Sequence, residues 1–161
     1  MRIATGVGAL ALVAISAIVS PLAAQQPVNP ADSGVTVTPG PVMRVSFYKI
    51  NTGMGQEFQQ DLRQHVVPVW EAQKAAGIIL GYQVVMNQTT DSPDDWNVAF
   101  AITYANWAVL DNMTDRTDPI TLRHYGTAEA RTAAGNRRAT IRTLVRSNLM
   151  RVQNVSRSPR P

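Results

Sequence analysis

Regular alternation of apolar and polar residues predicts the first strand of the chain. In residues 42–50, Met43, Val45 and Phe47 alternate with polar or amphipathic side chains, which is the period of a β-strand. Residues 78–86 and 96–104 form two further apolar segments, each with large side chains on one face and small, largely uncharged ones on the other. A sheet with one solvated face would carry charges there, so we expect both faces to be covered. A fourth strand is predicted over residues 140–152.

A long helix is predicted between the first two strands. Apolar residues recur at spacings of three and four over residues 56–76, and Gly77 follows as a C-cap. Pro68 lies inside this segment and removes a backbone donor, so a bend is expected there. A short helix over residues 107–113, a turn ending at Asp118 and Pro119, and an Ala- and Arg-rich helix over residues 127–139 follow.

This order of elements, β-α-β-β-α-β, predicts an α+β fold of the ferredoxin-like type over residues 42–152. The remaining segments are assigned differently. Residues 25–41 contain four prolines among polar residues and are predicted to be a flexible linker. Residues 153–161 are predicted to be a disordered basic tail.

The first 24 residues match the pattern of a secretory signal peptide. Arg2 precedes an apolar run over residues 7–19, and Pro21, Ala23 and Ala24 follow it. The run is shorter than the roughly 20 residues that a membrane span needs. We therefore expect cleavage after Ala24 and a periplasmic or secreted mature protein. The alternative is an N-terminal helix that is retained as an anchor.

Composition and charge narrow the chemistry. The 161-residue chain contains no cysteine, which excludes disulfides and thiolate chemistry. Its charge is uneven, because nine arginines and one glutamate follow residue 122. This predicts a basic surface for an anionic membrane or an acidic protein partner, with a solvated helix face and tail as the alternative. An exported protein is not expected to meet nucleic acid. The arginines assigned to this surface are Arg131, Arg137, Arg138, Arg142, Arg146 and Arg151.

Three short segments carry a resemblance to a known family. They are Gly77-Ile-Ile-Leu-Gly-Tyr82, Pro93-Asp-Asp-Trp-Asn-Val98 and Tyr104-Ala-Asn-Trp107. Together with the Pro-containing helix, they resemble uncharacterised bacterial members of the dimeric α/β-barrel superfamily. The resemblance implies a homodimer in which two sheets pack face to face. It also implies a range of activities, since the superfamily includes cofactor-free monooxygenases, haem-degrading enzymes, chlorite dismutase-like proteins and binding proteins.

Candidate site residues lie on the long helix and the strands. His65 falls on the sheet-facing stripe, where its imidazole could act as a general base or an axial ligand. The alternative is a buried, hydrogen-bonded structural residue. A cavity for a small apolar or aromatic ligand, or simple core packing, would account for the large aromatic residues near it. They are Trp70, Tyr82, Trp96 and Tyr104. His124 is expected at the surface.

No motif for a metal or a cofactor is recognisable, so none is predicted. The aspartates at positions 91, 94 and 95 lack the spacing of a calcium loop. Asn97, Trp96 and His65 match the residue types of the haem-degrading relatives, but their roles are not transferred. Three functions remain open: a binding protein for a small molecule, a cofactor-free monooxygenase or isomerase using the same pocket, and a structural subunit docking on a membrane complex.

Overall fold

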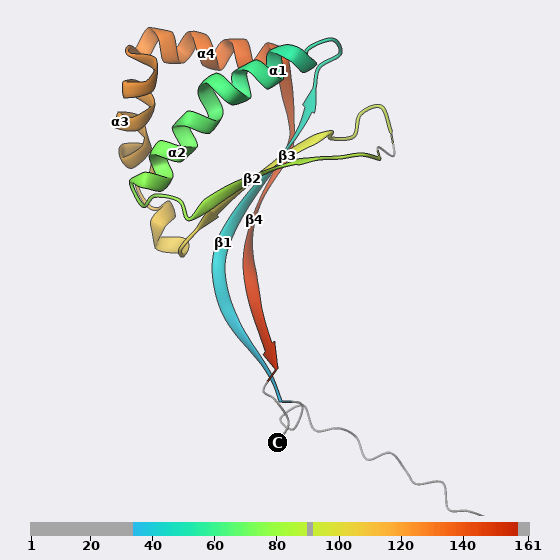
Figure 1. Cartoon of the computed structure of the whole chain (residues 1–161), viewed down its shortest axis with the longest axis vertical. Coiled ribbons are helices and arrows are strands. Elements are labelled where there is room, and N and C mark those ends of the chain that lie inside the picture. Colours follow the sequence, from blue (N-terminus) through green and yellow to red (C-terminus); the bar gives the residue numbers. More distant parts are fainter. Residues whose placement is uncertain (1–33, 90–91, 158–161) are drawn as a thin grey trace, which may run out of the picture. The chain divides into compact units, whose positions relative to one another are not determined.

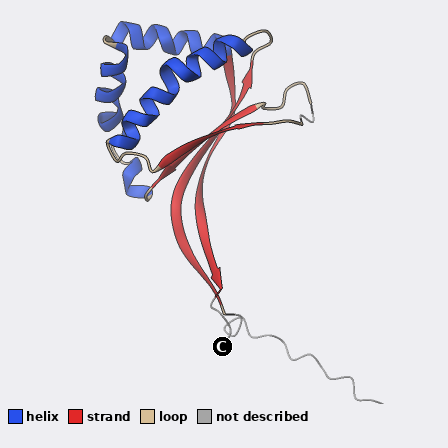
Figure 2. Ribbon diagram, in the orientation of Figure 1, coloured by secondary structure: helices blue, strands red, loops and turns tan. Residues whose placement is uncertain are grey.

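The computed structural model describes residues 34–89 and 92–157, which fold into an antiparallel sheet with helices on one face (Figures 1 and 2). The sheet has four strands in the order β2-β3-β1-β4. This is the ferredoxin-like α+β topology, so the predicted fold class is confirmed. The strands are β1 (Val35–Ile50), β2 (Gly81–Met86), β3 (Val98–Tyr104) and β4 (Arg142–Arg157).

The helix predicted between β1 and β2 is present, but it contains a π-helical turn. It comprises α1 (Gly55–Asp61), the π-helix η2 (Leu62–Val66) and α2 (Val67–Ala75). The N–H of Val67 bonds to the carbonyl of Leu62, five residues earlier. Pro68, which follows directly, has no N–H to give to an α-helical bond. The wider turn therefore lies where the regular hydrogen-bond pattern is interrupted, and π-turns of this kind are frequent at functional sites.

The connection between β3 and β4 is more helical than predicted. It comprises the 3-10 helix η3 (Trp107–Leu110), α3 (Met113–Tyr125) and α4 (Ala128–Ile141). The predicted turn ending at Asp118 and Pro119 is wrong, because α3 runs through Pro119. Met113 and Ile120 of α3 pack against the core, so tertiary packing outweighs the local preference of proline.

The ends of the domain are longer than predicted. Residues 35–39 of β1 pair with residues 153–157 of β4, beyond the point where β3 ends opposite Val42. The linker and tail predictions are therefore wrong for residues 35–41 and 153–157. Among the described strands, β4 is the one that pairs with β1 beyond the end of β3, and an edge position of this kind tolerates proline. The predicted signal peptide lies outside the described residues.

The two faces of the sheet pack differently. The larger core lies between sheet and helices and contains Phe58, Trp70 and Phe100. The opposite face carries a smaller cluster of Val45, Ala99 and Ala101, and no described helix covers it (Figure 1). Within the described residues, we find no helix of the length and apolar character that crossing a membrane requires.

Candidate functional site

A cavity of about 260 Å³ lies between the helices and the covered face of the sheet. Apolar and polar side chains both line it, and none of the described lining residues is acidic. Such a mixed lining is usual in pockets that bind small organic molecules. The lining residues are Arg44, Ser46, Tyr48, His65, Val66, Val69, Trp70, Phe100, Ile102, Thr121, Tyr125, Arg138 and Arg142.

The floor of the cavity comes from alternate residues of β1. Because side chains alternate across a strand, Arg44, Ser46 and Tyr48 all point to the helix side. The Ser46 hydroxyl lies 3.0 Å from that of Ser147 on β4. The Tyr48 ring contacts Phe100, with centroids 5.2 Å apart. β1 therefore presents a polar stripe to the interior.

His65 lies in the π-helical turn and contacts a second imidazole. Its Nδ1 atom is 3.1 Å from Nε2 of His124, and the Tyr125 ring lies 5.4 Å from its own. His124 is thus half-buried and not at the surface as predicted. Burial lowers the pKa of His124, and the positive charges of His65 and Arg138 lower it further. A neutral His124 can share a hydrogen bond with His65 without charge repulsion.

A buried carboxylate organises two of the arginines. Asp61 is nearly fully buried, and Nε of Arg138 lies 3.0 Å from each of its carboxylate oxygens. Arg138 also donates to the Tyr125 hydroxyl. Nη1 of Arg142 is 3.9 Å from the same carboxylate. Burial lowers the pKa of Arg142, although Tyr48 and Asp61 oppose this effect.

The predicted aromatic residues do not form one pocket. Trp70 lines the cavity, whereas Tyr82 is outside the lining. The Tyr82 ring packs on the Trp70 ring, with centroids 5.0 Å apart, and the Tyr82 hydroxyl donates to Glu71. Tyr104 is buried in the core outside the lining, and burial raises its pKa. Trp96 lies on the opposite face of the sheet, where it packs edge-to-face on Phe47. Extending the alternation of β3 back to Trp96 was wrong, since the strand begins at Val98.

The residue types shared with haem-degrading relatives are also separated. Oδ1 of Asn97 accepts a hydrogen bond from the backbone N–H of Ile50 at 2.8 Å. This amide therefore joins β1 to the start of β3. Because Trp96 is on the uncovered face and His65 is in the cavity, the three residues do not converge on one site.

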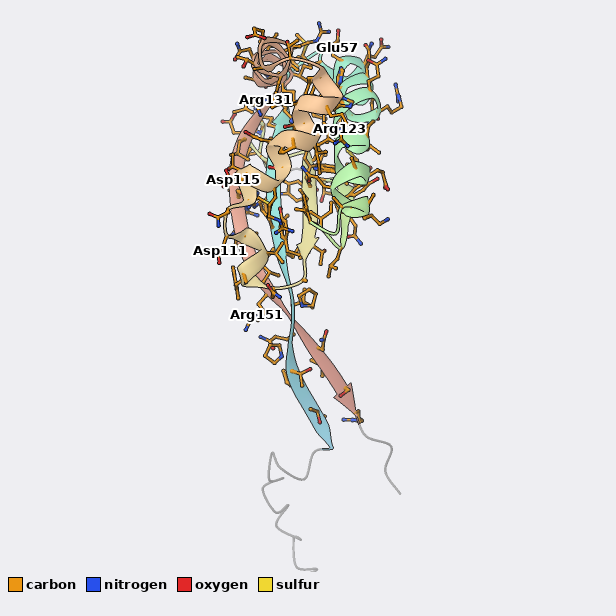
Figure 3. All side chains as sticks on the ribbon, turned by 90° about the vertical axis from the view of Figure 1, so that its left-hand side faces the viewer. Glu57, Asp111, Asp115, Arg123, Arg131 and Arg151 are labelled. Atoms are coloured by element: carbon orange, nitrogen blue, oxygen red, sulfur yellow. The ribbon has the colours of Figure 1, made fainter. Side chains whose placement is uncertain are left out.

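The predicted basic surface is not one patch. Arg138 and Arg142 turn inward to the cavity, and Arg146 covers Phe47 on the opposite face of the sheet. Figure 3 shows Arg131 and Arg151 well apart, with Asp115 and Asp111 between them in that view. Arg131 is paired with Asp118 at 3.0 Å. Arg137 is exposed on α4.

Sequence reasoning missed most of the polar lining of the cavity. The available signal was the alternation in β1, which places Arg44, Ser46 and Tyr48 together on one face of a strand. No comparable signal marks Arg142 or Tyr125, because their positions depend on packing between distant segments. Among the described residues, no group of three histidine or acidic side chains is arranged to hold a metal ion.

Comparisons with known proteins identify no relative by sequence. No family model matches the chain, and no curated protein does. A dimeric protein of unknown function with a ferredoxin-like fold from Bacteroides fragilis is 17% identical, with a TM-score of 0.38 over 75% of this chain and 95% of its own. A hypothetical Arabidopsis thaliana protein is 11% identical, with a TM-score of 0.43 over 74% and 93%. A dimeric ferredoxin-like protein from an uncultured marine organism is 11% identical, with a TM-score of 0.39 over 74% and 96%.

Proposed function

We propose that this domain is an exported binding protein for a small organic molecule, which it holds between the helices and the sheet. The observation that carries the proposal is the cavity of about 260 Å³, whose wall combines Trp70, Phe100 and Ile102 with inward hydroxyl, imidazole and guanidinium groups. Apolar walls supply binding energy, and a few fixed polar groups supply orientation and specificity. The volume limits the ligand to a small one.

An isomerase that uses the same cavity is the second candidate. The contact between His65 and His124 at 3.1 Å favours it. An imidazole at a cavity wall can take a proton from a substrate carbon and return it at another position, which is general acid–base catalysis. Such a reaction needs no cofactor.

Filling the cavity tests the binding function. Val69 lines it from α2, so Val69→Trp would occupy the space that a ligand needs. Leu80→Trp is the matched control, because Leu80 is exposed and outside the lining. Native mass spectrometry of protein purified from its own host should show a bound small molecule in the wild type and the control, and none in Val69→Trp. A ligand retained by all three proteins would contradict the proposal.

Replacing His65 separates a chemical role from a structural one. His65→Ala should abolish binding or turnover with little change in the free energy of unfolding if the imidazole contacts the ligand. A loss of several kcal/mol without a selective effect on binding would assign His65 to packing. Urea unfolding and ligand titration of the same preparation measure both quantities.

Export is proposed from the sequence pattern of the first 24 residues. N-terminal sequencing of the protein from its host should give Gln25 as the first residue. Recovery of intact Met1 in the membrane fraction would contradict cleavage and favour the anchored alternative.

A further inference from the structure

Arg142 is fixed at the junction between α4 and β4 by the turn that follows β1. The N–H of Asn51 bonds to the carbonyl of Ile141 at 2.9 Å, and its side-chain amide donates to the carbonyl of Thr140 at 2.8 Å. Asn51 thus holds both residues that precede Arg142. The Arg142 side chain turns under the helices, and 10% of it is exposed.

Aromatic rings hold the guanidinium of Arg142 without neutralising it. Its central carbon lies 4.7 Å from the centroid of Phe100 and 4.8 Å from that of Tyr48. Such contacts fix the plane of the group and favour its charged form. They accept no conventional hydrogen bond, so the N–H groups of Arg142 still need acceptors.

Within the described chain, the buried Nη1 of Arg142 has no hydrogen-bond partner. The carboxylate of Asp61 is 3.9 Å away, which is too far for a hydrogen bond. That carboxylate is already engaged by Arg138 at 3.0 Å. A buried donor without a partner is costly, and a charged one more so. The guanidinium therefore lacks an acceptor, and the cavity that Arg142 lines is where one would approach it.

The charges around the cavity also favour an anionic ligand. Asp61 supplies one negative charge beside the positive charges of Arg138 and Arg142, and Arg44 adds a third cation to the lining. His65, which also lines the cavity, and His124 beside it can add further positive charge. An anion entering the cavity would restore the balance and remove the cost of the unpaired donor.

We propose that the ligand is a small carboxylic acid, whose carboxylate bonds to the guanidinium of Arg142 and whose apolar part lies against Trp70 and Ile102. This inference rests on the binding function proposed above. A planar guanidinium matches a planar carboxylate in shape and charge. Inorganic phosphate would satisfy the donor but leave the apolar wall uncovered, so a carboxylate on an apolar body fits the lining better.

Pairs of matched ligands test the proposal on the full-length mature protein. Benzoate and benzamide have nearly the same shape, as do phenylacetate and phenylacetamide, but one of each pair is neutral. Saturation-transfer NMR and calorimetry should show each acid binding at least about tenfold more tightly than its amide, because a hydrogen bond to a charged group is stronger than a neutral one. Inorganic phosphate is titrated separately.

Substitutions then assign the preference to Arg142. Arg142→Met should remove the preference for the acid while the protein stays at least as stable, because a partly unpaired buried charge is lost. Arg142→Lys keeps the charge, reports on binding if the Met variant fails to fold, and should reduce the preference. Arg137→Met, on the exposed face of α4, should behave as the wild type.

The outcomes separate this inference from the binding function. Equal binding of acids and amides, both blocked by Val69→Trp, would overturn the carboxylate and leave the binding function standing. Binding of phosphate alone would replace the carboxylate with an inorganic anion and overturn the inference. No binding of any probe, together with no ligand in the protein from its host, would overturn both. A preference for the acid that survives Arg142→Met would overturn the inference that Arg142 binds the carboxylate.

Discussion

The two faces of the sheet differ in the side chains that they present. The face that the helices cover presents Arg44, Ser46 and Arg142 to a cavity, whereas the face that no described helix covers carries Val45, Ala99 and Ala101. In most sheets with one covered face, the polar side chains lie on the open side. This difference supports the ligand cavity that we propose on the covered face and favours contact of the uncovered face with another apolar surface.

The uncovered face is also shaped for contact. Ala99 and Ala101 are buried there because the larger Phe47 and Trp96 pack beside them, with ring centroids 5.0 Å apart. Two such surfaces can stack at the usual distance of about 10 Å between sheets. We therefore propose a homodimer through this face, in which each protomer keeps its own cavity on the far side.

A charge at the centre of the uncovered face should have the largest effect. Ala101 lies opposite Val45 on β1 and Gln83 on β2. In a symmetric dimer, Ala101→Glu would bury two unpaired carboxylates, each costing several kcal/mol. Light scattering should show a dimer for the wild type at micromolar concentration and a monomer for the variant. Ala133→Glu, on the exposed side of α4, is the control. A monomeric wild type would refute the dimer.

Truncating one aromatic residue on each face should give unequal losses of stability. Phe58 is fully buried between α1 and the sheet and stacks on Phe100. Phe58→Ala should lower the free energy of unfolding by about 3–5 kcal/mol. Phe47→Ala should cost about 1–2 kcal/mol in the monomer, because Phe47 is half-buried there. Urea unfolding in the Ala101→Glu background measures both. Equal losses would mean that the two faces are equally packed.

The pattern of the strands allowed the fold to be predicted, but it could not show which arginines are internal. The alternation in β1 assigns its residues to the correct faces, because successive side chains of any strand point to opposite sides of the sheet. Nothing in the spacing of the last nine arginines distinguishes Arg142, which is buried, from Arg146, which lies on the other face. Phe47 pairs with Arg146, but Tyr48 pairs with Leu144, so β4 has one extra residue at this point. This bulge lies between Arg142 and Arg146 and places their side chains on opposite faces.

The same limit applies to the helical side of the cavity. The pairing of His65 with His124 joins residues 59 positions apart, across η2 and α3. α3 itself was not predicted, since the proline at position 119 is a strong local signal against a helix. Packing between distant segments determines both the formation of α3 and its contact with His65. The local sequence pattern therefore could not predict this part of the site.

Removing the buried carboxylate should have an intermediate effect. Asp61→Asn leaves Arg138 and Arg142 without their shared counter-ion. Losing one partner of a buried pair costs about 3–5 kcal/mol, and partial exposure of Arg138 reduces the expected loss to about 2–3 kcal/mol. Asp118→Asn is the control, because it breaks the more exposed pair with Arg131 and should cost less than about 1 kcal/mol. Similar losses in both variants would contradict a buried charge cluster on the covered face.

The smallest expected effect concerns pH and the imidazole pair. Because the folded protein lowers the pKa of His124, the unfolded chain binds the proton more readily. The stabilisation from neutral His124 is therefore complete above its unfolded pKa of about 6.5 and is lost as the pH falls through the folded value. His124→Gln should remove this part of the pH dependence. Urea unfolding of both proteins from about pH 8 to about pH 5 measures it, and their difference cancels the carboxyl groups common to both. A difference that does not change with pH would show that the covered face exerts no effect on the protonation of His124.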